Sequence, residues 1–395
     1  MKLLIVSNMT HYRTADGGIV GWGPTVEEID SLATLFDEVR HLAFLHPGSP
    51  PPTLLPYRAP NVRFLPLPPS GGSSLRDKVD ILYKSPPYVI SMLRESRWAD
   101  VVFVRCPCNV GLIAILLLAF CRHPRYRWAK YGGNWRPSGP EAWSYTLQRW
   151  WLNKGLHKGV VTVNGRWSGQ PRHVYSFLNP SLSQQDLEQG RLAGEGKELR
   201  LPVYLLFVGR IEEAKGVGRI LRIARALHAN GVSFELHLVG DGPERPTFEQ
   251  QARREGIADY TAFHGWLPKP ALADFYRRAH IFIFPSLSSE GWPKVLSEAM
   301  AYGVVPVASA ISSISQVLAD TGAGLALPPE NIEAFVQAIE SYLNCPEAWY
   351  QASRAGMAAA ARFTYDAYLD AVREMFQEAW GLELGRKNPT KDGDQ

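Results

Sequence analysis

The sequence predicts an α/β protein made of two doubly wound units, each a mostly parallel sheet between helices. Short, continuous apolar runs such as KLLIVS (2–7), VYLLFVG (203–209) and IFIFPS (281–286) are typical of buried parallel strands. These runs alternate with helical segments, which is the pattern of parallel α/β sheets. The alternation stops at 179–202 and then begins again. A length of 395 residues with 46% hydrophobic residues is sufficient for two such domains.

The first half of the chain starts with the strand 2–7, which a glycine-rich loop, ADGGIVGWGP (15–24), follows. The segment TVEEIDSLATLF (25–36) is predicted to be helical, because Thr25 can cap it and Glu28 stands three residues later, as in a capping box. The other predicted elements of this half are strand 39–45, a Pro/Gly/Ser-rich connection near 47–74, helix 75–96 and strands 100–105, 127–133 and 159–165.

The second half follows the polar stretch 179–202, which we interpret as a linker. The segment GVGRILRIARALHANG (216–231) is amphipathic and ends at Gly231, a common helix terminator. The other predicted elements are strands 203–209, 234–240, 261–266, 281–286 and 304–309, and helices 243–256, 270–279, 294–303, 331–343 and 364–381. We therefore expect domains at 1–182 and 183–362, a late helix at 363–383, and a polar, disordered tail at 384–395.

Composition points to a cytoplasmic protein. No stretch reaches the roughly 18 apolar residues that a membrane span needs, and MKLLIVSNMT at the N-terminus resembles a first strand more than a signal peptide. Neither the two neighbouring cysteines, Cys106 and Cys108, nor Cys121 and Cys345 have disulfide or zinc spacing. A reducing compartment is therefore expected.

Charge is unevenly distributed along the chain. Positions 1–180 contain 21 Lys and Arg against 11 Asp and Glu, and the segment 105–172 contains eleven basic residues and one acid, Glu141. This balance fits either a solvated surface or an anionic partner, such as an anionic membrane or phosphates. Within the same segment, the block 122–159 holds five tryptophans that could be core residues, stack on sugars or lie at a membrane interface: Trp128, Trp135, Trp143, Trp150 and Trp151.

Two glutamates stand eight positions apart in FPSLSSEGWPKVLSEAMAYGVVPVAS (284–309). Glu290 is placed in the loop after a predicted strand, and Glu298 about one turn into the helix that starts near Pro293 or Lys294. The N–H groups of that helix start form an anion site suited to phosphate. A nucleotide diphosphate sugar, with phosphates between two hydroxyl-bearing groups, would fit. Alternatively, the two carboxylates only favour the helix start electrostatically.

A second pair of charges is predicted at the same sheet edge. Arg210 and Lys215 follow strand 203–209, in FVGRIEEAKGVGRI (207–220), and a guanidinium beside an ammonium suits a diphosphate. Two more strand-end turns, LVGDGPER (238–245) and FHGWLPK (263–269), could line a slot for a base. No Asp-x-Asp pair, as expected of a metal-bound diphosphate, stands in these strand-end loops.

The order FVGR…KG, LVGDGPE, FHGW and FPSLSSEG…SEAMAYGVVPVAS resembles the family 4 retaining glycosyltransferases of the GT-B fold, in which two Rossmann-like domains face each other across a cleft. The resemblance covers nearly the whole chain and is strongest in 203–325. It implies that 1–182 binds the acceptor, that 183–362 binds the nucleotide sugar, and that the helix 363–383 crosses back to the first domain.

The same resemblance implies roles for individual residues. Glu290 would bind hydroxyls of the transferred sugar and Glu298 those of the ribose, while Arg210 and Lys215 would stabilise the departing diphosphate. Neither a cofactor nor a metal is expected. The further donor-binding residues would be Gly17, Gly18, Gly209, Gly240, Trp266, Leu267, Gly291, Trp292, Pro293, Lys294 and Val295.

The chain departs from the family on the acceptor side. Many members have a His where this chain has Arg105, and another His where it has AKYGGNW (129–135). A side-chain base is therefore in doubt, and the departing phosphate would take the acceptor proton. We assign Arg105, Tyr131 and Asn134 to acceptor or phosphate contacts, although Arg105 could also simply form a salt bridge at a strand end.

The resulting prediction is a retaining hexosyltransferase that uses a UDP- or GDP-sugar and a lipid-linked or oligosaccharide acceptor, in bacterial cell-surface polysaccharide synthesis. Peripheral attachment to the inner face of the cytoplasmic membrane is expected, and nucleic acid is not. Two alternatives stay open. A sugar-nucleotide 2-epimerase has the same architecture but needs a titratable pair at carbon 2, and a non-catalytic subunit would not need the charged residues.

Overall fold

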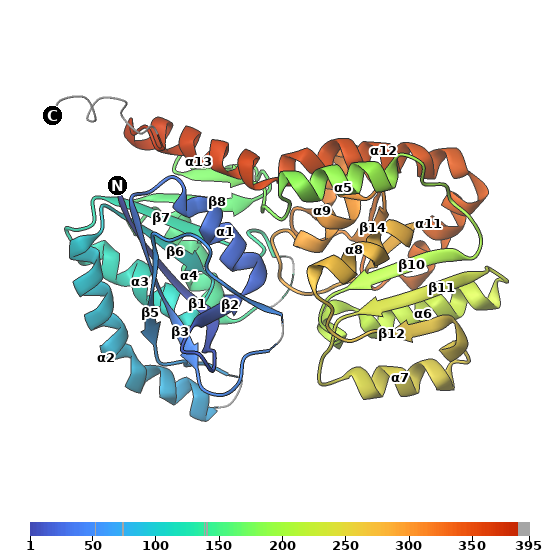
Figure 1. Ribbon diagram of the computed structural model, residues 1–395, viewed down its shortest axis with the longest axis horizontal. Coiled ribbons are helices and arrows are strands. Elements are labelled where there is room, and N and C mark those ends of the chain that lie inside the picture. Colours follow the sequence, from blue (N-terminus) through green and yellow to red (C-terminus); the bar gives the residue numbers. More distant parts are fainter. Residues whose placement is uncertain (52, 73–74, 138, 140, 386–395) are drawn as a thin grey trace.

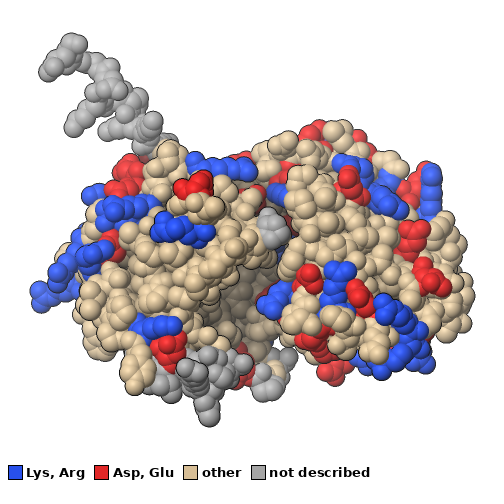
Figure 2. All heavy atoms as spheres, turned by 60° about the horizontal axis from the view of Figure 1, so that its bottom comes forward, with Lys and Arg blue, Asp and Glu red and all other residues tan. Residues whose placement is uncertain are grey.

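The computed structural model describes residues 1–385 except 52, 73–74, 138 and 140, and it shows two α/β domains side by side (Figure 1). The fold class predicted from the apolar runs is confirmed. The predicted disordered tail lies, apart from Leu384 and Gly385, outside the described residues. Between the two domains the molecular surface is hollowed, which Figure 2 shows from the open side.

The N-terminal sheet has seven parallel strands in the order β5-β3-β1-β6-β7-β8-β9. The short strand β2 pairs antiparallel with β1, and β4 pairs antiparallel with β2. Its strands are β1 (Lys2–Arg13), β2 (Ile19–Trp22), β3 (Glu38–His46), β4 (Leu54–Pro56), β5 (Val62–Leu67), β6 (Val101–Cys106), β7 (Tyr126–Tyr131), β8 (Val160–Asn164) and β9 (Val174–Phe177). Its helices are α1 (Gly23–Ala33), α2 (Leu75–Trp98), α3 (Asn109–Phe120) and α4 (Trp143–Asn153).

Alternating residues of these strands pack into two separate cores, one on each face of the sheet. On β6, Val102 and Val104 join the core that helices α2, α3 and α4 cover, whereas Val101 and Phe103 join the core beneath α1. The strands are therefore apolar throughout because both faces are buried.

The C-terminal sheet is entirely parallel, in the order β12-β11-β10-β13-β14-β15. Its strands are β10 (Val203–Val208), β11 (Phe234–Val239), β12 (Thr261–Phe263), β13 (Ile281–Phe284), β14 (Val305–Ser309) and β15 (Leu325–Leu327). Its helices are α5 (Gln184–Gly194), α6 (Val217–Ala229), α7 (Arg245–Arg254), α8 (Lys269–Arg278), α9 (Lys294–Ala301), α10 (Ile314–Thr321), α11 (Ile332–Asn344) and α12 (Pro346–Ala360).

Two local predictions are wrong. The stretch 179–202 is not only a linker, because it contains α5, which begins with a capping box between Ser183 and Asp186 and packs on α9. The predicted capping box at Thr25 and Glu28 does not form: α1 begins at Gly23, and Glu28 is turned into the protein, where cations hold it. In both cases, contacts with distant parts of the chain determine the structure: α5 packs on α9, and Glu28 pairs with cations of other elements.

The chain passes between the domains twice, and the two crossings run side by side. The first crossing follows β9, and the second joins the 3₁₀ turn Ala361–Phe363 to α13 (Tyr365–Trp380). Leu182 and Thr364 form an isolated parallel bridge, and the Ser181 N–H donates to the Phe363 carbonyl at 2.9 Å. Helix α13 lies along the N-terminal domain in Figure 1 and closes its second core with Val372 and Phe376.

None of the helices within the described residues combines the length and the apolar composition that a membrane crossing requires.

Candidate functional site

Glu290 and Lys215 meet at the carboxyl ends of two neighbouring strands. Lys215 ends the 3₁₀ turn Glu213–Lys215 after β10, and Glu290 lies in the loop between β13 and α9. Since β10 and β13 are paired, these two loops leave the sheet side by side. The Lys215 ammonium forms an ion pair with the Glu290 carboxylate. Two residues 75 positions apart in the printed sequence are therefore brought into direct contact, as the predicted sheet edge implied.

Lys215 is held in a place that weakens its charge. Burial lowers the pKa of its ammonium to about 8, the Glu212 carboxylate acts in the opposite direction, and the charge of Arg210 lowers it further. The Arg210 guanidinium itself is largely exposed and lies 3.3 Å from Glu212. Lys215 therefore lies near a second, exposed cation, and a dianionic ligand would be attracted to both.

Glycines let these loops pack closely. Gly240 has φ +132°, and a Cβ there would lie 1.8 Å from the Gly209 carbonyl oxygen. Gly216, which follows Lys215, has φ +89°, and a Cβ there would lie 2.2 Å from the Pro285 carbonyl oxygen. Only glycine fits both demands at Gly216, and this contact places the Lys215 turn against the Glu290 loop.

Glu298 occupies a separate environment on α9. The Tyr276 hydroxyl donates a hydrogen bond to it at 2.9 Å. Burial raises the pKa of the Glu298 carboxyl, while the nearby ammonium groups of Lys269 and Lys294 act to lower it. Glu290 and Glu298 are thus two carboxylates with different surroundings, the first paired with a cation and the second held by a tyrosine.

The loop that carries Glu290 also contacts the N-terminal domain. The Gly291 N–H donates to the Gly132 carbonyl at 3.0 Å, and a Cβ on Gly291 would lie 2.2 Å from the Asn164 Nδ2 atom. The Asn134 N–H lies 3.4 Å from the Ser289 hydroxyl, to which it donates. Asn134, predicted on the acceptor side, is therefore beside the loop that carries Glu290, and Gly291 is a point of contact between the domains.

A buried charge cluster joins the domains beneath this contact. Glu28 of α1, only 1% exposed, lies 2.7 Å from Arg105 of β6, 2.6 Å from Lys130 of β7 and 3.5 Å from Lys294 of α9. The Lys294 ammonium also donates to the Pro24 carbonyl at 2.7 Å. Burial alone would raise the pKa of Glu28, but the three cations hold it well below its usual range. Burial lowers the pKa of Lys130 to about 8.

This cluster changes the interpretation of two predicted residues. Arg105 is engaged by Glu28, so the salt-bridge alternative describes it in this structure. The side chain of Lys294 reaches across to the N-terminal domain. Only its backbone is therefore available at the start of α9. Glu28 was missed as a site residue because its partners stand 77 and 102 positions away in sequence.

Two aromatic residues predicted to contact ligands are buried in the cores. Tyr131 is 1% exposed, and its hydroxyl accepts a hydrogen bond from Arg149 at 3.3 Å. Burial raises the pKa of Tyr131 to about 12. Trp292 is 3% exposed and stacks on Phe363, with 4.9 Å between ring centroids. Their side chains support the walls of the site and do not line it.

The remaining predicted residues lie near the rims of the hollow or at its loops. Trp266 is exposed, and its ring contacts Trp22 of the other domain edge to face, with centroids 6.3 Å apart. Leu267 packs partly buried on the C-terminal core, as does Val295, while Pro293 caps α9. Gly17 and Gly18 form the turn between β1 and β2, where their backbones bond with Arg13 and Thr14.

Comparison with known proteins matches the C-terminal domain to a family. Residues 197–362 match the family model of glycosyl transferases group 1. A D-inositol 3-phosphate glycosyltransferase of Kribbella flavida is 30% identical over 199 residues, covering 47% of this chain and 46% of the relative. The putative colanic acid biosynthesis glycosyltransferase WcaL of Salmonella typhimurium is 30% identical over 136 residues, covering 33% of each chain. The chain spans about half the length of the first curated relatives that it matches.

Solved structures match the whole chain in fold. Sucrose-phosphate synthase of Thermosynechococcus elongatus superposes with a TM-score of 0.71 at 17% identity, over 96% of this chain and 99% of the other. Anabaena Alr3699/HepE in complex with UDP gives a TM-score of 0.66 at 14% identity, over 96% and 100%. The protein thus has the GT-B fold, and its residues 197–362 carry the pattern of the group 1 glycosyl transferases.

Proposed function

We propose that the protein is a retaining glycosyltransferase that moves a hexose from a UDP- or GDP-sugar to a lipid-linked or oligosaccharide acceptor. The observation that carries this proposal is the Lys215–Glu290 pair at the edge of the C-terminal sheet, with Arg210 beside it. A carboxylate that binds hydroxyls and two cations that bind a diphosphate are the groups that a nucleotide sugar requires in one place.

In this mechanism the bond between the sugar's anomeric carbon and the diphosphate breaks, and the acceptor oxygen forms a bond to the same face of that carbon. Lys215 and Arg210 stabilise the negative charge that develops on the departing diphosphate. Glu290 accepts hydrogen bonds from sugar hydroxyls and fixes the sugar's position. The departing phosphate oxygen takes the acceptor proton, so no side-chain base and no metal is required.

The comparisons support the substrate classes in this proposal. Alr3699/HepE was solved with UDP, and relatives include glycosyltransferases of colanic acid and amylovoran biosynthesis. These are properties of the relatives. For this chain, they favour a nucleotide sugar as donor and a growing surface polysaccharide as acceptor.

Peripheral membrane attachment is part of the proposal, and exposed aromatic and basic groups support it. Phe120 at the end of α3 is 85% exposed, and Trp143 and Trp150 of α4, on one helix face, are 73% and 51% exposed. Arg122 and Arg125 are exposed in the loop after α3. Figure 2 shows Lys and Arg gathered at the outer end of the N-terminal domain, away from the hollow. Such groups suit shallow insertion into an anionic surface.

Not all of the basic and aromatic residues of this segment serve that surface. Arg127 is buried and donates to four backbone carbonyls, among them those of Leu118 and Cys121, so it fixes the end of α3. Trp128 and Trp135 are core residues. The core alternative is therefore correct for these two tryptophans, and Arg127 is a buried structural cation.

The decisive experiment is incubation with a panel of UDP- and GDP-hexoses and lipid-linked acceptors, with and without a chelator. We expect nucleoside diphosphate and a sugar conjugate with retained configuration, unchanged by chelation and strongly reduced in Glu290→Gln. Glu374→Gln, an exposed site on α13, is the matched control. A converted sugar nucleotide without transfer would identify an epimerase instead, and activity that only Mg²⁺ or Mn²⁺ restores would overturn the metal-free mechanism.

A further inference from the structure

A pocket lies at the hinge, apart from the Lys215–Glu290 pair. Its volume is about 240 Å³, and both domains and both chain crossings line it. Leu178 belongs to the first crossing and Arg362 to the second, while Arg166 follows β8 and Asp320 lies on α10. A molecule bound here would contact both domains and both chain crossings, which are the segments that change position when the domains change their relative orientation.

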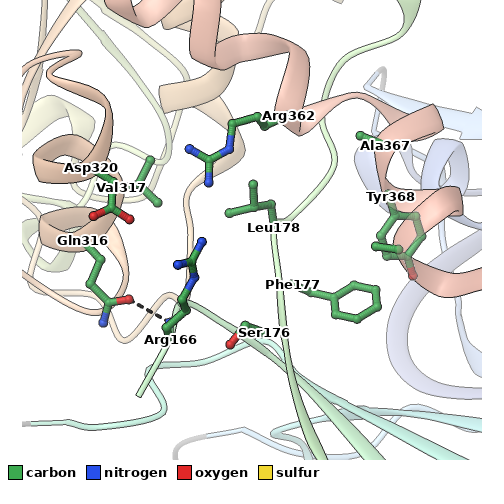
Figure 3. A pocket seen from close by; sticks show the side chains of 12 residues that line it. Arg166, Ser176, Phe177, Leu178, Gln316, Val317, Asp320, Arg362, Ala367 and Tyr368 are labelled. Atoms are coloured by element: carbon green, nitrogen blue, oxygen red, sulfur yellow. Dashed lines mark hydrogen bonds between the residues drawn. The ribbon is translucent and has the colours of Figure 1, made fainter. Parts of the chain in front are cut away.

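Two arginines point into this pocket from opposite sides. Figure 3 shows the guanidinium groups of Arg166 and Arg362 extending toward each other, with the Asp320 carboxylate on a third side. Within the described residues, none of these three side chains takes part in an ion pair or a side-chain hydrogen bond. Both arginines are solvent-exposed, and an anion between their guanidinium groups would be able to bind both.

The size and the remaining lining define the ligand further. The pocket is smaller than the roughly 300–1,000 Å³ of sites for drug-sized ligands, so a complete nucleotide sugar does not fit. Arginine forks match the oxygens of a phosphate. Asp320 and the Ser176 side chain can bind hydroxyl groups, and Leu178 and Val317 offer apolar contact. We propose that this hinge pocket binds a small phosphate monoester of a polyol and thereby stabilises the present arrangement of the two domains.

Hydrogen bonds connect the pocket with the loop that carries Glu290. The Arg166 N–H donates to the Gln316 side chain of α10 at 2.8 Å. At the start of the same helix, the Ser313 hydroxyl donates to the Gly291 carbonyl at 2.6 Å. A ligand that ties Arg166 and Arg362 to α10 therefore restrains the donor loop as well. If the proposed donor site is correct, the two ligands strengthen each other's binding reciprocally.

The test is isothermal titration calorimetry of the full chain with glycerol 3-phosphate, with glycerol and inorganic phosphate as comparison probes. We expect glycerol 3-phosphate to bind more tightly than either, and Arg166→Gln combined with Arg362→Gln to weaken it at least tenfold. Arg354→Gln, an exposed position on α12, is the matched surface control, and Arg210→Gln reports on phosphate binding in the donor site.

The outcomes separate the hinge pocket from the donor site. Binding that survives in Arg210→Gln and fails in the hinge variants supports the proposal, whether or not UDP binds. No binding at millimolar concentration, or binding that only Arg210→Gln abolishes, overturns it. In wild type, saturating glycerol 3-phosphate should also lower the Kd for UDP severalfold. An unchanged Kd for UDP would overturn the coupling. Absence of UDP binding to the wild type without glycerol 3-phosphate would count against the proposed donor site.

Discussion

Replacing Glu28 with Gln should destabilise the protein much more than removing one of the cations that surround it. One buried carboxylate stands among Arg105 at 2.7 Å, Lys130 at 2.6 Å and Lys294 at 3.5 Å. Gln has nearly the same shape, so the substitution removes the negative charge and leaves Arg105, Lys294 and Lys130 without a counter-charge. The pKa of Lys130 then falls further, because Glu28 no longer raises it. Breaking a buried ion network by removing one partner typically costs about 3–5 kcal/mol of unfolding free energy.

Lys294→Met is the matched control, because it leaves the carboxylate with two cations. It loses the hydrogen bond to the Pro24 carbonyl but reduces the positive charge of the cluster, so we expect a change below about 1 kcal/mol. Thermal unfolding can be followed by the fluorescence of the 12 tryptophans. At about 2–4 °C per kcal/mol for domains of this size, Glu28→Gln should melt roughly 6–20 °C lower. Equal melting temperatures for the two variants would refute the reasoning.

The pH dependence provides an internal check. Because the cations hold the pKa of Glu28 well below the usual range of a glutamate, its charge stabilises the folded state above that usual range. The contribution is lost as the pH falls through the lower, folded-state pKa. The gap between wild type and Glu28→Gln should therefore be constant near neutral pH and shrink in acid. A gap that persists in acid would indicate a packing defect.

Three further outcomes are expected. Glu290→Gln and Lys215→Ala should each lower kcat about a hundredfold or more with an unchanged thermal melt, since a preorganised charge contact contributes about that much; near-normal rates would remove both from the site. In the proposed mechanism Lys215 must be protonated to stabilise the diphosphate, so kcat/KM should fall as the pH rises through about 8. Lys215→Arg, which stays charged, should shift that decline to higher pH. A decline at the same pH in this variant would assign the titration to another group. The protein should float with anionic vesicles at low salt but not at high salt, and Arg122→Glu with Arg125→Glu should weaken this binding; no flotation at low salt would favour a soluble acceptor.

Local patterns in the sequence predicted most of the fold. Continuous apolar runs identified the central parallel strands because those strands are buried on both faces. The strand-end position of Glu290 and Lys215 was predictable for the same reason, since parallel strands deliver all of their carboxyl ends to one edge. The glycine-rich stretch 15–24 was less informative: β1 extends to Arg13 and turns back as β2, which no local apolar run announces.

What the sequence could not predict depends on partners far along the chain. Thr25 and Glu28 have capping-box spacing, but Glu28 forms ion pairs with cations on β6, β7 and α9 instead. The tryptophans of 122–159 stand in one aromatic and basic block of the sequence. In the structure some of them are core residues, such as Trp128, and others are exposed, such as Trp143. Helix α5 is polar, and its Gly190 packs so closely that a Cβ would lie 2.5 Å from the Ala301 carbonyl oxygen. Such a contact is visible only in three dimensions.

Helix α13 makes the first domain dependent on a segment that is synthesised only after the second domain. Val372 and Phe376 complete the core that Trp128 and Phe36 begin, so the part of this face of the N-terminal sheet that α1 does not cover stays exposed while 183–362 is translated. At roughly 5–20 residues per second, about 200 residues take on the order of 10–40 s, during which a nascent chain exposes this apolar face to chaperones. An isolated 1–182 fragment would keep that defect permanently, whereas a circular permutant that joins 365–380 to the N-terminus would remove it.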